Sequence, residues 1–333
     1  MSSSPEPSEA RLVRWLPLGP LILALGACGE GVLDPSGHEA SRVAGIWWLM
    51  FTLGAAIYVV VLVLLAIALR RGRREQSSDS RSSRFAGTPL VVGGGLVLPV
   101  LVMALLTSVT AMSTGRADAG ATTVEIEARQ YWWRVSYPGA GGVVTANEIH
   151  IPVGEPVELV LTSTDVIHSL WVPELAGKID LVPGRTNRMT IEADEAGEYR
   201  GRCAEFCGLA HAHMELLVIA EPPEDFARWL DNEARDSVEP TSDGELAGRE
   251  VFLGSCSYCH TVRGTNATSD FGPDLTHLAS RRTIAAGLLP NTVGDLAGWI
   301  LDPQRHKPGN AMPAMQLEPD ALQDLLTYLE TLE

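Results

Sequence analysis

The sequence contains little cysteine and little positive charge, and each shortage excludes a class of structure or function. Cysteine occurs only five times in 333 residues. One cysteine lies in the N-terminal leader and the other four stand near histidine or methionine, so no pair remains for a structural disulfide. Lysine and arginine number 25 against 41 acidic residues, giving a net charge of −16 that is carried beyond residue 115. A chain this acidic is not expected to bind nucleic acid.

Charge is also absent from two long apolar stretches, residues 43–69 and 85–115. Each exceeds the roughly 20 residues that cross the hydrocarbon core of a membrane, so the sequence predicts two transmembrane helices. Gly93–Gly95 and Pro99 interrupt the second stretch. The alternative is a buried helical hairpin of a soluble protein, but apolar runs of this length are rare in soluble domains.

The connection between the two stretches, residues 70–84, is strongly basic. Short basic loops stay on the cytoplasmic side of a membrane, so both termini are expected on the outer side. Everything after about residue 116 would then lie in the periplasm. The connection has only two acidic residues against six arginines, which are Arg70, Arg71, Arg73, Arg74, Arg81 and Arg84.

Residues 1–28 have the pattern of a secretory leader. Arg11 and Arg14 precede a short apolar run that ends at Cys28, and the run is too short to span a bilayer. Leu25–Cys28 resembles the lipobox of bacterial lipoproteins. Lipidation of Cys28 and other processing of the leader both stay open.

Beyond the apolar stretches the pattern changes to short strands and then to helices. Residues 121–220 combine alternating segments with frequent proline and glycine, which predicts a β-sandwich. Residues 221–243 are expected to form a linker with one short helix. Residues 244–333 are expected to be all-helical, beginning with the capping-box pair Ser242 and Glu245 and ending in an apolar stripe. The stripe consists of Leu322, Leu325, Leu326, Leu329 and Leu332.

Soft metal-ligand types crowd into residues 203–214 of the sandwich. Cys203, Cys207, His211 and Met214 lie within twelve residues, and His168 ends an apparent strand upstream. Thiolate, imidazole and thioether select copper over hard cations. A mononuclear copper site needs only one cysteine, so the second cysteine favours a dinuclear site. A disulfide between the two is the alternative, and His213 is expected at the surface.

The segment Cys256-Ser-Tyr-Cys259-His260 predicts covalent attachment of a c-type haem. The two thiols would bond the haem and His260 would take one axial position, leaving methionine or histidine for the other. Met312 and Met315 are the candidates. A disulfide between the two cysteines is one alternative and zinc is another, although His277 is the only near residue that could complete a zinc site.

The copper pattern and its surroundings resemble the CuA domain of cytochrome c oxidase subunit II. The resemblance implies a cupredoxin-like Greek-key sandwich after a two-helix transmembrane hairpin. It assigns the two coppers to His168, Cys203, Cys207, His211 and Met214. It also implies that Glu205 gives copper its backbone carbonyl, while its side chain helps hold magnesium at the contact with subunit I. The family run ending in Trp-Val-Pro follows His168, and residues 178–187 match as well.

Gln130-Tyr131-Trp132-Trp133 resembles the aromatic segment through which family members accept electrons from cytochrome c. The family's usual first tryptophan is Tyr131 here, which counts against input from a free soluble cytochrome at this surface. Packing inside the sandwich is the alternative role for Trp132 and Trp133. Residues 244–333 resemble a class I cytochrome c, whose axial methionine precedes proline. That resemblance favours Met312.

Together the resemblances predict the electron-input subunit of a haem-copper oxidase of the inner membrane. The complex is an oxidoreductase that reduces oxygen to water and pumps protons, whereas this chain only transfers electrons from a fused haem c to CuA and on to subunit I. Expected partners are subunits I and III, and cytochrome c or another donor. Quinol oxidases keep this architecture without copper ligands, so the intact set argues against them. A nitric oxide reductase subunit and a membrane-anchored copper-delivery or redox-sensing protein remain alternatives.

Overall fold

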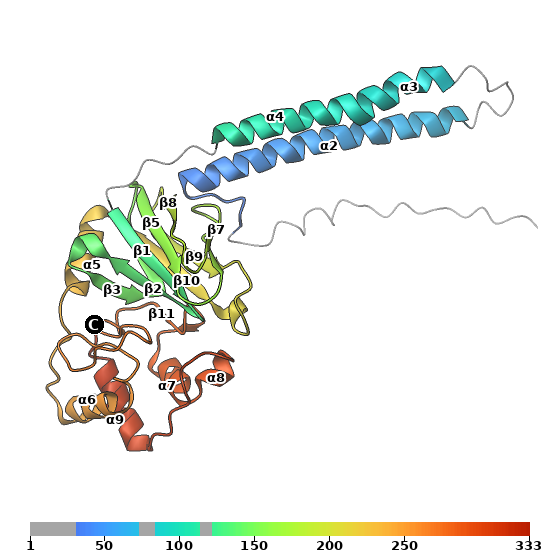
Figure 1. Cartoon of the computed structure of the whole chain (residues 1–333). Helices are drawn as coiled ribbons and strands as arrows, with labels where there is room; N and C mark the ends of the chain where they lie inside the picture. Colours follow the sequence, from blue (N-terminus) through green and yellow to red (C-terminus); the bar gives the residue numbers. More distant parts are fainter. Residues whose placement is uncertain (1–30, 73–83, 114–121) are drawn as a thin grey trace, which may run out of the picture.

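The computed structural model describes residues 31–72, 84–113 and 122–333. These residues form three parts, a pair of long helices, a β-sandwich and a helical domain (Figure 1). The sandwich lies between the other two parts. The predicted leader with Cys28 and most of the predicted basic loop lie outside the described residues.

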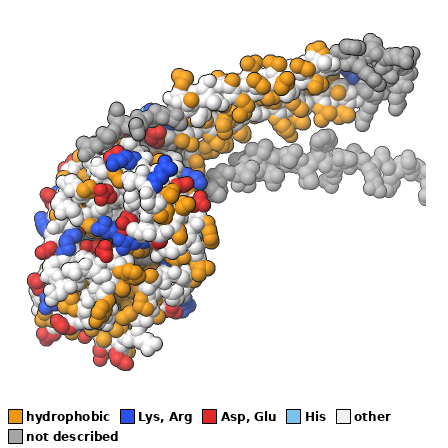
Figure 2. All heavy atoms as spheres, viewed as in Figure 1, with side chains coloured by type: hydrophobic (Ala, Val, Ile, Leu, Met, Phe, Trp, Pro, Cys, Tyr) orange, Lys and Arg blue, Asp and Glu red, His pale blue; other side chains and the backbone are white. Residues whose placement is uncertain are grey.

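The helix pair comprises α2 (His38–Gly72) and a second, broken helix that runs beside it. The second helix consists of α3 (Arg84–Val92), the π-helical turn η2 (Gly93–Val97) and α4 (Leu98–Ser113). Spans of 34 and 26 residues are long and apolar enough to cross a membrane. The π-turn contains the three consecutive glycines, which lack the side chains that would hold a regular helix in register. Figure 2 shows hydrophobic side chains along the pair, while charged ones gather on the other two parts.

Helix α2 begins directly on the sandwich. The backbone N–H of Ser36 donates to the carbonyl of Glu174 at 2.8 Å, and the carbonyl of Ser36 accepts from the N–H of Asp194 at 2.8 Å. A β-carbon at Gly37 would lie 2.2 Å from the carbonyl oxygen of Glu192, so only glycine fits this approach. The junction fixes the sandwich at the end of the helix pair.

The sandwich has two five-stranded sheets, in the orders β3-β2-β1-β5-β8 and β4-β10-β9-β6-β7. The pairs β1–β5 and β4–β10 are parallel and the other pairs are antiparallel. Side chains of β5 alternate between buried and half-buried, as the period of a half-buried strand requires. The strands are β1 (Thr122–Arg129), β2 (Trp132–Tyr137), β3 (Val143–Ala146), β4 (Glu148–Pro152), β5 (Val157–Ser163), β6 (His168–Trp171), β7 (Ile179–Leu181), β8 (Asn187–Ile191), β9 (Gly197–Cys203) and β10 (Glu215–Glu221).

Helix α5 (Pro223–Glu233) follows the sandwich and covers part of it. The ring of Trp229 stacks on His150 with centroids 3.9 Å apart and meets Tyr137 edge-on at 5.3 Å. Phe226 is buried in the same cluster. The first half of the segment expected to be a linker is therefore a helix that extends the sandwich core.

The helical domain is built on the crossing of its first and last long helices. These are α6 (Asp243–Ser255) and α9 (Pro319–Leu329), and between them lie β11 (Thr283–Ile284), β12 (Leu289–Pro290), α7 (Val293–Leu301) and α8 (Pro303–His306). The capping box at Ser242 and Glu245 is present. A β-carbon at Gly248 would lie 2.0 Å from the carbonyl oxygen of Asp324, so the glycine lets the two helices touch. Four leucines of the predicted stripe, Leu325, Leu326, Leu329 and Leu332, are buried.

Candidate copper and haem centres

Sheet pairing brings the predicted copper ligands to one end of the sandwich. His168 begins β6 and Cys203 ends β9, and these strands are antiparallel neighbours. The chain then turns through residues 203–214, which we call the copper loop, before Met214 leads into β10. The backbone N–H of Cys203 donates to the carbonyl of Met214 at 2.9 Å and closes the loop. A contiguous loop and one strand end therefore supply the whole predicted ligand set.

The two sulfurs of the copper loop lie side by side, with Cys203 Sγ 3.9 Å from Cys207 Sγ. Each has one imidazole beside it, because His168 Nδ1 lies 3.8 Å from the first sulfur and His211 Nδ1 lies 3.7 Å from the second. Met214 Sδ is 3.9 Å from Cys207 Sγ. The carbonyl oxygen of Glu205 is 3.2 Å from Cys203 Sγ, and its exposed side chain faces away from the core.

The donor chemistry fits a soft cation. Without a cation the two buried thiols interact strongly, so that the hydrogen bond between them lowers the pKa of Cys203 and raises that of Cys207. Two thiolates this close repel each other unless positive charge lies between them. Paired thiolates with imidazole and thioether donors match copper. His213 is half-buried in the short helix η4 (His211–His213).

Asp165 orients His168, and the sequence patterns gave no sign of this role. Its carboxylate lies 2.8 Å from His168 Nε2, which leaves Nδ1 facing the sulfurs. Burial alone would raise the pKa of Asp165, but hydrogen bonds from His168 and from the N–H groups of Val166 and Gln130 lower it. A carboxylate on the far nitrogen fixes the ring and the tautomer of a metal-binding histidine.

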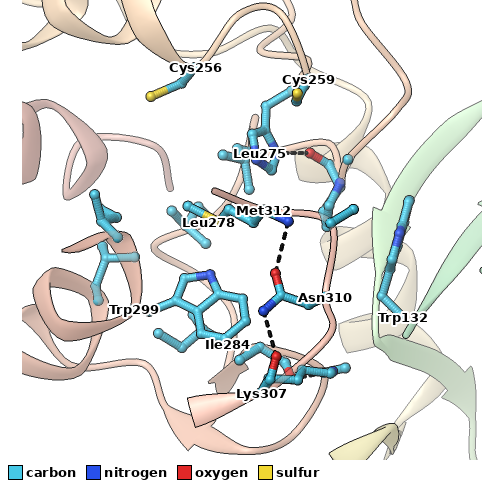
Figure 3. A pocket seen from close by; sticks show the side chains of 18 of the residues that line it. Trp132, Cys256, Cys259, Leu275, Leu278, Ile284, Trp299, Lys307, Asn310 and Met312 are labelled. Atoms are coloured by element: carbon cyan, nitrogen blue, oxygen red, sulfur yellow. Dashed lines mark hydrogen bonds between the residues drawn. The ribbon is translucent and has the colours of Figure 1, made fainter. Parts of the chain in front are cut away.

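The haem motif opens into a cleft that lies between the helical domain and the sandwich (Figure 3). Cys256 and Cys259 lie at one side of it, and Met312 enters from the segment after α8. Met315 lines the cleft too. Most of the wall is apolar, as a haem requires. The apolar lining includes Phe252, Leu275, Leu278, Ile284, Leu296, Trp299 and Ile300.

His260 is held as an iron ligand would be. Its Nδ1 lies 2.8 Å from the carbonyl oxygen of Pro273, so Nε2 is left free. Burial lowers the pKa of His260 and so favours the neutral ring that binds metal. A β-carbon at Gly272 would lie 2.8 Å from the ring of His260, so glycine lets this loop pack closely against the ring.

Met312 is fixed through its backbone. Its N–H donates to Asn310 Oδ1 at 2.8 Å, and Asn310 Nδ2 in turn donates to the carbonyl of Lys307 at 2.6 Å (Figure 3). His277, the residue considered for zinc, is buried elsewhere and lies 2.5 Å from the carbonyl of Glu333. The arrangement favours haem over zinc for this motif.

The aromatic segment, Gln130–Trp133, touches both candidate centres. Trp132 lines the haem cleft, whereas Trp133 is fully buried in the sandwich with its ring 6.1 Å from that of His168. The hydroxyl oxygen of Tyr131 accepts from the N–H of Leu209 at 3.1 Å, and the side-chain amide of Gln130 donates to the carbonyl of Cys207. The segment thus joins the cleft to the copper loop.

Family models match both domains. Residues 141–221 match the periplasmic domain of cytochrome c oxidase subunit II, and residues 246–333 match cytochrome c. The chain is therefore a membrane redox protein in which a cupredoxin-like domain is fused to a cytochrome c domain.

Comparison with individual known proteins narrows this class. Cytochrome c oxidase subunit 2 of Alkalihalophilus pseudofirmus is 36% identical, with 96% of this chain and 97% of that protein covered. Quinol oxidase subunit 2 of Bacillus anthracis is 28% identical and matches 70% of this chain and 83% of that protein. The chain belongs to the cytochrome c oxidase subunit 2 family. Among solved structures, the periplasmic domain of subunit II of cytochrome oxidase of Bradyrhizobium japonicum is 28% identical, covering 34% of this chain and 94% of that one with a TM-score of 0.34.

Family membership settles the coarse function. The chain is subunit II of a haem-copper oxidase of the inner membrane, and it associates with other subunits of that complex. The first domain implies a CuA copper centre and the second implies a haem. These findings confirm the predicted fold class and the predicted membership in the oxidase.

Proposed function

We propose that the chain carries electrons from an outside donor through its cytochrome c domain and then its cupredoxin-like domain to subunit I, where oxygen is reduced and protons are pumped. The haem and the copper pair each supply a one-electron redox centre. The residues of the chain hold these centres rigidly and exclude water, which keeps reorganisation between redox states small. The aromatic segment supports the route, because it contacts both the haem cleft and the copper loop.

We further propose that His168, Cys203, Cys207, His211, Met214 and the carbonyl of Glu205 bind the two coppers. The observation that carries this proposal is the pair of sulfurs 3.9 Å apart, each with an imidazole nitrogen within 3.8 Å. The exposed side chain of Glu205 is free to meet a partner subunit, which supports a magnesium ion at the contact with subunit I. Subunit III is proposed as a further partner.

For the haem we propose covalent attachment at Cys256 and Cys259, with His260 and Met312 as axial ligands. The free Nε2 of His260 and the backbone hydrogen bonds that hold Met312 support this choice. Met315 is the alternative sixth ligand, since it lines the same cleft. Covalent haem is attached outside the cytoplasm. We therefore place both redox domains in the periplasm, in agreement with the basic loop at residues 70–84.

Metal analysis of the purified oxidase tests the copper proposal. The wild-type chain should hold two coppers and one haem, with an electron paramagnetic resonance spectrum from one unpaired electron shared by both coppers. His211→Ala should lose that shared-electron spectrum and keep the haem. His213→Ala is the matched control from the same turn and should keep both. Two coppers and an unaltered spectrum in the His211 variant would contradict the ligand assignment.

The haem assignment is tested under denaturing conditions. Haem should stay with the wild-type chain after unfolding and should be released from Cys256→Ala together with Cys259→Ala. Met312→Leu should change the absorption band assigned to sulfur–iron ligation, and Met315→Leu is its matched control. Loss of that band only in the Met315 variant would reverse the choice of sixth ligand.

A further inference from the structure

The cytochrome c domain meets the cupredoxin-like domain through a hairpin, residues 283–290, which we call the docking hairpin. It consists of β11, a tight turn and β12. At the turn, the carbonyl of Ala286 accepts from the backbone N–H of Glu215 at 3.0 Å. A β-carbon at Gly287, whose φ is +79°, would lie 2.7 Å from Cβ of Glu215. The turn therefore packs against the residue that follows the predicted ligand Met214.

Lys307 is buried at this interface and binds backbone from both domains. Its Nζ donates to the carbonyl of Tyr131 at 2.6 Å and to the carbonyl of Ala285 at 2.9 Å. Only 3% of the residue is exposed, and burial lowers its pKa to about 7. The sequence contains just one other lysine, Lys178. A buried ammonium is costly unless its hydrogen bonds are satisfied, so these two carbonyls tie the domains together.

Glu148 makes the reciprocal contact from the cupredoxin-like domain. Its Oε1 accepts from the backbone N–H groups of Arg282 at 2.7 Å and Thr283 at 3.0 Å, where the docking hairpin begins. The residue is only 3% exposed. Each domain thus contributes one buried ionisable side chain that binds the backbone of the other. An exposed ion pair, Arg282 with Glu198 at 3.2 Å, lies on the same interface.

We propose that Lys307 and Glu148 are positioning residues that hold the cytochrome c domain in one docked orientation. This proposal rests on the proposed electron route. Lys307 holds the aromatic segment at Tyr131, which is itself 7% exposed, while the adjacent Trp132 forms part of the haem cleft. Docking therefore covers the surface at which a separate cytochrome would deliver electrons to copper. An outside donor must instead act on the exposed side of the cytochrome c domain.

Amine labelling tests the docked arrangement without any electron transfer. The full-length holoprotein in detergent is treated with an amine-reactive acylating reagent, and the modification of both lysines is followed by peptide mapping. Lys307 should react at least about tenfold more slowly than the exposed Lys178, because the reagent reaches its amine only when the interface opens. Opening breaks buried hydrogen bonds, and the loss of one such bond already shifts the opening equilibrium by about that factor. Both should react at similar rates after unfolding. Equal rates in the folded protein would overturn docking.

A variant at the other contact sharpens this test. Glu148→Ala leaves two buried N–H groups unpaired and should raise the reactivity of Lys307 about tenfold. Glu198→Gln removes only the exposed ion pair of the same interface and should leave that reactivity within about twofold. Unchanged reactivity in the Glu148 variant would overturn its share in docking. Retained haem and copper spectra show that each variant folds.

The positioning role is tested in the intact oxidase by single-turnover reduction of the haem followed by optical detection of copper reduction. Lys307→Met should slow transfer from haem to copper about tenfold or more, since small displacements of reacting groups strongly lower a reaction rate. The same variant should let an added reduced cytochrome c reduce copper directly. Positioning would be refuted by one combination of results in Glu148→Ala. Lys307 would react with the acylating reagent as fast as Lys178, while transfer from haem to copper kept its wild-type rate. If the wild-type oxidase does not hold the two coppers, the proposed electron route is refuted, whereas the docking result from amine labelling still stands.

Discussion

The two candidate centres of this chain are built in different ways. The copper site belongs to one domain, where a twelve-residue loop and one strand end bring five side chains within 4 Å of a neighbouring sulfur. The haem cleft is walled by both domains, since Trp132 and Tyr131 of the sandwich line it together with the helical domain. The copper site therefore depends on local folding, and the haem environment depends on docking as well.

This difference assigns separate roles to the neighbouring aromatic residues. Trp133 is fully buried beside His168 and serves the sandwich core, whereas Trp132 faces the haem cleft. Tyr131 binds the copper loop through its hydroxyl and Lys307 through its carbonyl. One short segment thus contributes to the core, to the copper loop and to the interface between domains.

The largest expected effect separates the two tryptophans. Trp133→Ala should lower the free energy of unfolding of the sandwich by about 3–5 kcal/mol, because it removes a large buried ring. Trp132→Ala is the matched control and should leave that stability within about 1 kcal/mol while slowing transfer from haem to copper. Chemical denaturation followed by copper absorption measures the first effect. A stable Trp133 variant would mean that the sandwich does not depend on this ring.

The helical domain should respond independently of the sandwich. Gly248→Ala places a β-carbon 2.0 Å from the carbonyl oxygen of Asp324 and 2.7 Å from Cβ of Tyr328. Such overpacking should cost about 1–3 kcal/mol and lower the temperature at which the haem spectrum is lost. The copper spectrum should melt as in the wild type. Gly254→Ala, on the same helix with open space around it, is the control.

The next expected effect is on copper affinity and concerns the carboxylate that orients His168. Asp165→Ala removes the carboxylate that holds His168 Nε2, and loss of such a partner weakens metal affinity by about 10–100-fold. Competition with a copper chelator measures this change. Asp180→Asn changes an exposed carboxylate in the neighbouring strand β7 and should leave affinity unchanged. An Asp165 variant that resists the chelator as the wild type does would show that packing alone orients the histidine.

Sequence patterns predicted the fold class because each part has its own period. The apolar runs, the alternating strands and the capping box at Ser242 depend on neighbouring residues in the sequence. The structure has the corresponding helices, strands and cap at these positions. Four of the predicted copper residues share one short motif, so their proximity followed from spacing, whereas His168 was assigned through the family resemblance. Residues whose roles depend on contacts between distant segments gave no such signal.

Lys307 and Glu148 are examples of what spacing could not reveal. Lys307 meets Tyr131 across 176 positions of sequence, and Glu148 meets Arg282 across 134. Neither pair has a motif, because a side chain that binds a backbone group places no demand on the residue type at the other end. The covering of the aromatic segment by the fused domain was likewise invisible until both domains were placed together.

The smallest expected effect concerns pH and the sandwich alone. The hydrogen bond with His150, opposed by burial, lowers the pKa of Glu221 below its ordinary value of 4.5. A lowered carboxyl pKa adds stability that is complete above 4.5 and is lost as pH falls through the folded-state pKa. Glu221→Gln should therefore reduce sandwich stability at neutral pH by less than about 1 kcal/mol, because the carboxyl is partly exposed, and should flatten the loss below pH 4.5. Thermal melts of the copper band at neutral and acid pH measure the difference. Glu155→Gln, in a turn of the same domain, should change neither slope nor stability, and the haem transition should not respond to either substitution.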